Sequence, residues 1–183
     1  LSSMKKSNLI YLFLIVFFLG SCSVKQQTVA DQTEFDNGAV VTAHPIASEV
    51  GVEILKKGGN AVDAAIAVKF ALAVVYPNAG NLGGGGFLVY RGKDGSVSSL
   101  DFREKAPEKA FKDMYLDKDG NPITDLSLYG QLASGVPGSV AGMDAAYKKY
   151  GSLPWKDLVQ PAIDLAAKGF PLTEKQAGEF NRY

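Results

Sequence analysis

Arg103 is the side chain with the clearest chemical potential in this sequence. It stands in the segment LDFRE (100–104), where alternation along a strand would turn Asp101 and Arg103 away from their apolar neighbours. A guanidinium offers a planar fork of donors that matches a carboxylate at two points, so Arg103 is a candidate anion clamp. The residues alone favour a simpler interpretation, a surface ion pair of Arg103 with Asp101 or Glu104, worth about 0–1 kcal/mol.

A second candidate is the glycine-rich stretch NAGNLGGGGFLVYRG (78–92), because glycines let a backbone approach a phosphate closely. Phosphate loops run from a strand through glycines into a helix, whose N-terminus holds the anion. Here the expected order is reversed, and neither a Gly-Lys-Ser/Thr ending nor a dinucleotide fingerprint is present. We therefore favour a turn with positive φ, or a close approach of backbone, over nucleotide binding.

The sequence offers few residues for a catalytic nucleophile or a metal site. The single histidine, His44, precedes Pro45 and suits the start of a helix, yet any Ser-His-Asp or Cys-His triad would depend on it. One Cys and one His are too few for a His/Cys metal site, so no metal and no cofactor are expected. The stretch from Asp117 has Pro122 where a calcium loop needs glycine, which indicates a turn. We identify no catalytic nucleophile in this sequence.

Composition sets the outer limits of these interpretations. The 183 residues are 46% hydrophobic, which suits one globular domain or a piece of a larger one. There are 19 Lys and Arg residues against 19 Asp and Glu, so the net charge is zero and nothing indicates nucleic-acid binding.

The first 37 residues differ in character from the rest. Two lysines after Met4, an 11-residue apolar run at 9–19 and then small residues predict a signal peptide over 1–21. A membrane span would need more residues, since each adds about 1.5 Å of helix to a core of roughly 30 Å. The segment LGSC (19–22) resembles a bacterial lipobox, so we expect Cys22 to be lipidated. Residues 22–37 would then tether a domain at 38–183 to the bacterial cell envelope, on its periplasmic side or at the cell surface.

Local patterns predict the elements that would position the candidate residues. Asn60 can cap a helix with Asp63 in its first turn; this helix is apolar on nearly every face and should be buried. Pro161 should bend or restart a later helix. The expected elements are a strand at 39–43, helices from Pro45 to Gly58-Gly59 and at 61–75, hairpin strands at 87–91 and 96–102, helices at 137–150 and 155–168, and a helix after Thr173. Their order predicts an α+β fold, with helices layered on a mixed sheet.

Four segments together closely resemble the gamma-glutamyltransferase, or gamma-glutamyltranspeptidase, family. They are AHPIASEVGVEILKKGGNAVDAAIA (43–67), ALAVVYPNAGNLGGGGFLVY (71–90), LDFREKAP (100–107) and ASGVPGSVAG (133–142). The resemblance implies an N-terminal-nucleophile hydrolase with a layered αββα sandwich. Residues 38–183 would be the N-terminal part of its large subunit, so only that portion of the sandwich is expected here.

The family also implies a reaction. A precursor cleaves itself, and the Thr exposed at the new N-terminus of the small subunit attacks a gamma-glutamyl amide, with its own α-amino group as base. The gamma-glutamyl-enzyme then passes its acyl group to water or to an amino acid or peptide; glutathione is the usual donor. Arg103 falls on the family's donor-carboxylate arginine, which reverses the preference for a surface ion pair.

The nucleophile has no counterpart in this sequence. Its five threonines, at 28, 33, 42, 124 and 173, match no Thr-Thr-His-like site, so we expect the catalytic Thr beyond residue 183 and an inactive chain by itself. Two alternatives stay open: a related acylase acting on a beta-lactam such as a cephalosporin, and a non-catalytic lipoprotein that binds a ligand or partner. Sequence downstream of Tyr183 would separate the enzymes from the binder.

Overall fold

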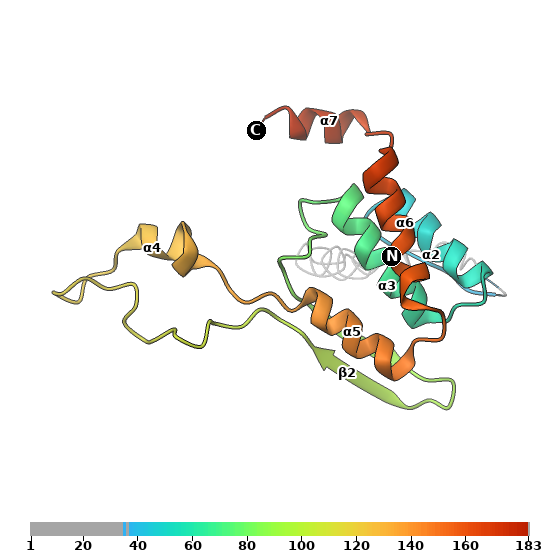
Figure 1. Ribbon diagram of the computed structural model, residues 1–183, viewed down its shortest axis with the longest axis horizontal. Helices are drawn as coiled ribbons and strands as arrows, with labels where there is room; N and C mark the ends of the chain where they lie inside the picture. Colours follow the sequence, from blue (N-terminus) through green and yellow to red (C-terminus); the bar gives the residue numbers. More distant parts are fainter. Residues whose placement is uncertain (1–34, 36, 183) are drawn as a thin grey trace, which may run out of the picture. The chain divides into compact units, whose positions relative to one another are not determined.

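The computed structural model describes residues 35 and 37–182 (Figure 1). The signal peptide and Cys22 lie outside these residues, and the part from Asn37 onward forms a unit that is described by itself. Its elements are α2 (Pro45–Lys56), α3 (Ala61–Val75), β1 (Phe87–Arg91), β2 (Val97–Asp101), α4 (Thr124–Leu128), the 3₁₀ turn η1 (Gln131–Ala133), α5 (Ser139–Tyr150), α6 (Trp155–Lys168) and α7 (Glu174–Phe180). The α+β class expected from the sequence is confirmed.

Helix α3 forms the centre of the core. The Asn60 side chain accepts hydrogen bonds from the backbone N–H groups of Val62 and Asp63, and the Asp63 carboxylate accepts from the Asn60 N–H, which completes a capping box. Ile66 and Phe70 are buried on the helix, which packs against α2, α5 and α6. The prediction of a capped, largely buried helix is confirmed.

The hairpin follows the predicted strands and turn. Strands β1 and β2 pair antiparallel, with Leu88 opposite Leu100, and Gly95 takes a φ of 82° in the turn. Leu88 and Leu100 pack on the core and α5 contacts β2, so one face of the hairpin is covered by helices (Figure 1). This hairpin is the whole sheet of the described residues, which therefore shows two antiparallel strands and not the mixed sheet expected.

The predicted strand at 39–43 is wrong. These residues have no regular structure, and Val41 is 94% exposed. Their β-branched composition suits a strand, but a strand also needs the backbone of a neighbour to pair with. Between Asn37 and Arg182 no strand lies alongside this segment.

Residues 105–135 leave the hairpin and return to it. An antiparallel bridge of Lys105 with Val136 joins the two ends of this segment. The Asp117 Oδ1 accepts hydrogen bonds from the N–H groups of Asp119 and Asn121, each at 2.8 Å, so the predicted turn is confirmed. Helix α4 and η1 were not predicted, because each is too short for an apolar period to be visible.

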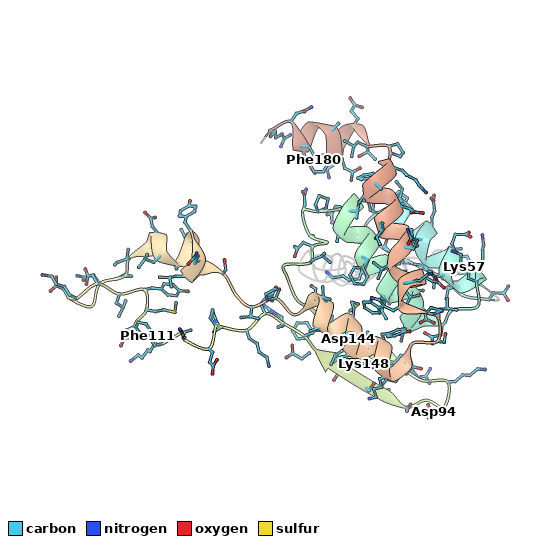
Figure 2. All side chains as sticks on the ribbon, viewed as in Figure 1. Lys57, Asp94, Phe111, Asp144, Lys148 and Phe180 are labelled. Atoms are coloured by element: carbon cyan, nitrogen blue, oxygen red, sulfur yellow. The ribbon has the colours of Figure 1, made fainter. Side chains whose placement is uncertain are left out.

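The last three helices begin close to the predicted positions. A bend or a restart was expected at Pro161, and the restart does not occur, because α6 continues through this residue as one element. Leu158 and Ala162 on either side are buried and hold the helix to the core. Asp144 and Lys148 pair at 2.7 Å on an exposed face of α5 (Figure 2). None of the helices in the described ranges is long and apolar enough to cross a membrane.

Candidate functional site

Arg103 lies just beyond the C-terminal end of β2, with 65% of its side chain exposed. The half-buried Leu100 and Phe102 pack on the core, whereas Asp101 and Arg103 are exposed. The strand alternation expected from the sequence therefore holds, and the hairpin presents the guanidinium on its outer side.

Both acidic neighbours contact Arg103. Its Nε donates to Glu104 Oε2 at 3.2 Å, and its backbone N–H donates to Asp101 Oδ1 at 3.0 Å. The Arg103 Cζ also lies 6.0 Å from the centre of the Phe87 ring. Within the part of the chain that the structure describes, the Nη groups of Arg103 have no hydrogen-bond partner. Arg103 therefore does form the surface ion pair, but only through Nε, and its two Nη groups stay available for a carboxylate.

The Glu104 carboxylate is suited to hold the guanidinium. Its own backbone N–H lowers the pKa of Glu104; partial burial raises that pKa, and the Arg103 guanidinium and the Gly85 N–H lower it further, for a net decrease. Glu104 is therefore ionised at neutral pH and attracts Arg103 Nε as a full charge.

The glycines of residues 78–92 allow a close approach of backbone, which is one of the two interpretations favoured from the sequence. A Cβ at Gly85 would lie 2.6 Å from the Phe102 carbonyl oxygen and 2.8 Å from Arg103 Cα. Positive φ, the other alternative, is wrong here: the glycines with positive φ lie elsewhere, at 38, 58, 95, 120, 130 and 169. The glycines therefore bring their own backbone against the segment that carries Arg103.

His44 has a structural role, as its position beside Pro45 indicated. The residue is 5% exposed. Its Nδ1 accepts a hydrogen bond from the Ile46 N–H at 3.3 Å, and its Nε2 lies 3.3 Å from Gln176 Oε1. No group of His, Cys, Asp and Glu that could hold a metal ion occurs among residues 35 and 37–182. Over the described part of the chain, neither His44 nor a metal ligand set contacts Arg103.

Sequence reasoning missed the residues of α5 that pack on Phe102, the neighbour of Arg103. Gly138 and Gly142, at the start of α5, pack directly against Phe102. Gly142 could have been noticed, because glycine inside a helix costs about 1 kcal/mol relative to Ala and needs a packing reason.

Two solved structures resemble this chain and indicate the class of protein to which it belongs. The solved structure of Helicobacter pylori gamma-glutamyltranspeptidase matches with a TM-score of 0.78 and 51% identity, over 83% of this chain and 44% of that one. A cephalosporin acylase from Bacillus halodurans matches with a TM-score of 0.63 and 27% identity, over 81% of this chain and 29% of that one. These likenesses define part of an N-terminal-nucleophile hydrolase.

The family profile described as gamma-glutamyltranspeptidase matches residues 47–183. A glutathione hydrolase proenzyme from Pseudomonas sp. (strain A14) is 56% identical over 156 residues, which are 84% of this chain and 27% of that protein. The chain belongs to the gamma-glutamyltranspeptidase family, as the four segments indicated, and it spans about a quarter of the length of the curated relatives it matches.

Proposed function

We propose that the complete protein transfers or hydrolyses gamma-glutamyl groups, with glutathione as a donor. Membership of the family and relatives named glutathione hydrolase proenzyme support this function. The observation that carries it is the exposed guanidinium of Arg103, which Glu104 holds through Nε and whose two Nη groups have no partner among the residues that the structure describes. That arrangement suits the α-carboxylate of a gamma-glutamyl donor, which needs a two-point cationic partner.

In this proposal Arg103 binds and orients the donor. The Nη groups donate to the two oxygens of the α-carboxylate, and this contact fixes where the gamma-carbonyl of the bound donor lies. A Thr at the N-terminus of a small subunit from the same precursor attacks this carbonyl, its hydroxyl proton passes to its α-amino group, and the leaving amine takes up a proton. Water or an amine acceptor then attacks the resulting ester and releases the Thr hydroxyl. Fixed orientation of this kind accounts for much of an enzyme's rate enhancement.

Arg103→Ala in the complete protein tests the proposal. The variant should raise the KM for a gamma-glutamyl donor at least about tenfold, because a charge-assisted two-point contact is lost. Arg91→Ala, at an exposed position on β1 of the same hairpin, is the matched control and should leave KM unchanged. An unchanged KM in Arg103→Ala would reject the assigned role.

A beta-lactam acylase is the second candidate, favoured by the structural likeness to the cephalosporin acylase. A carboxylate clamp would serve an acylase donor equally well. Assays of the complete protein on glutathione and on an acylated beta-lactam separate the two functions by their kcat/KM. Turnover of neither substrate would instead support the binding lipoprotein.

We also propose that Cys22 is acylated and anchors the protein to the bacterial envelope. The support is the sequence alone: a basic start, an apolar run and the LGSC segment (19–22). Mass spectrometry of the mature N-terminal peptide should show a lipid on Cys22. Cys22→Ser should move the protein from the membrane fraction to the soluble one, and an unmodified thiol in the wild type would contradict the anchor.

A further inference from the structure

We propose that four glycines, Gly85, Gly86, Gly138 and Gly142, form a clamp on Phe102 that positions Arg103 for its ligand. The inference rests on the proposed function, since Arg103 is the group whose position is controlled. The clamp joins the glycine stretch before β1 to the start of α5, two segments that are separated along the chain by the hairpin and residues 105–135.

One side of the clamp comes from the glycine stretch just before β1. A Cβ at Gly86 would lie 2.9 Å from Phe102 Cε2, and one at Gly85 would meet the backbone of Phe102 and Arg103. The Phe102 N–H donates to the Gly86 carbonyl at 3.0 Å, so the two segments are also bonded. Any side chain at Gly85 would have to displace backbone at Arg103, which no rotamer change could avoid.

The other side comes from α5, where both glycines run against local preference. Gly138 is the N-cap, a position where Ser, Asn or Asp would stabilise the helix, but its Cβ would collide with the Phe102 carbonyl. Gly142 lies inside the helix, where Ala would be favoured by about 1 kcal/mol, but a Cβ there would lie 2.6 Å from Phe102 Cδ2. The space that Phe102 occupies explains why glycine stands at both positions.

Backbone hydrogen bonds tie the two sides together. The N–H groups of Gly138 and Ser139 both donate to the Gly84 carbonyl, at 2.9 and 3.0 Å. Phe102 is thus held by its ring and by its carbonyl, and the next residue, Arg103, faces outward from a fixed Cα. The ion pair with Glu104 then orients the guanidinium. The clamp glycines act on Arg103 through Phe102, so they are positioning residues.

Gly142→Ala in the complete protein is the first test. The added methyl should push Phe102 away and shift Arg103, raising the KM for a gamma-glutamyl donor about fivefold or more with kcat changed much less, since small displacements in a site are costly. The kcat/KM ratio between this donor and its analogue with an amidated α-carboxylate should fall. Gly178→Ala in α7 is the control, because nothing in the described chain lies within 4 Å of that Cβ.

A compensating change makes the test specific. Gly86→Ala should also raise the donor KM, and Phe102→Leu combined with it removes the outer ring atoms Cε2 and Cζ that the Gly86 methyl would meet, so this double variant should have a lower donor KM than Gly86→Ala. Leucine would not relieve Gly142→Ala in the same way, because it keeps Cβ and Cγ, which a methyl at Gly142 would also meet. If Gly142→Ala prevents folding, Gly86→Ala replaces it, because its nearest neighbour is a ring edge that can yield.

Arg103→Ala in the same assay separates a failure of the donor-binding role of Arg103 from a failure of the clamp. An unchanged KM in Arg103→Ala would overturn the donor-binding role that the proposed function gives to Arg103. A raised KM in Arg103→Ala, with an unchanged KM and unchanged carboxylate discrimination in a folded Gly142→Ala or Gly86→Ala, would overturn the clamp alone. A general loss of kcat on both donors, without compensation by Phe102→Leu, would also reject it, because that pattern indicates a structural role.

Discussion

Asp63 and Ser152, 89 positions apart, are joined by two hydrogen bonds: the Ser152 N–H donates to Oδ1 at 3.0 Å and its hydroxyl to Oδ2 at 2.5 Å. The Asp63 residue is fully buried, and its Oδ2 also accepts from the Asn60 N–H at 2.9 Å. One carboxylate therefore caps α3 and fixes the turn between α5 and α6.

Asp63→Ala should lower the free energy of unfolding of the complete protein by about 2–3 kcal/mol, because several hydrogen-bond donors lose a buried, charged acceptor. Denaturant unfolding measures the change. Asp144→Ala, which breaks an exposed pair with Lys148, is the control and should cost no more than about 0.5 kcal/mol (Figure 2). Equal effects of the two variants would contradict this role of Asp63.

The same carboxylate should make stability depend on acid. Burial by itself raises the pKa of Asp63, but hydrogen bonds from Ser152, Asn60 and Leu153 outweigh it, so the net pKa is lowered. Its contribution to stability is complete above the ordinary Asp pKa of about 3.9 and is lost as pH falls through the lowered value. Asp63→Asn should therefore flatten the fall in melting temperature below about pH 4. A variant that keeps the wild-type slope would show that other groups cause the acid loss.

Helix limits were predictable because their signals are local. Asn60 and Asp63 indicate a cap within four residues, and Thr173, after which a helix was predicted, forms a capping box with Gln176 in the structure. The segment 39–43 could not be judged in the same way, since a strand depends on a partner distant in the sequence.

The site was only partly predictable for a related reason. Arg103 was found because its segment resembles a family motif and because a guanidinium suits a carboxylate. The contacts of Gly85, Gly138 and Gly142 with the Phe102–Arg103 segment became visible only once the fold brought three segments together. A glycine's sequence position gives no sign of which backbone it approaches.

The cap on α2 predicts a difference between two substitutions of His44. Its Nδ1 accepts from the Ile46 N–H, so His44→Ala should cost about 1–2 kcal/mol of stability, whereas His44→Asn keeps a capping acceptor and should lose less. Both variants should keep the kcat of the folded complete protein, since His44 has no chemical role in the proposed reaction. A large loss of kcat in a stable His44→Asn would place the imidazole in catalysis.

Arg103→Lys distinguishes charge from geometry at the proposed donor site. Lysine keeps the positive charge but replaces a planar fork with a single ammonium, and it loses the contact of Arg103 Nε with Glu104. In the complete protein the donor KM should rise, though less than in Arg103→Ala, and it should rise further with salt, because a point charge at an exposed position is screened. Initial rates across donor concentrations at low and high ionic strength measure both effects. A wild-type KM at both ionic strengths would mean that charge alone suffices and that the two-point contact with the carboxylate is not formed.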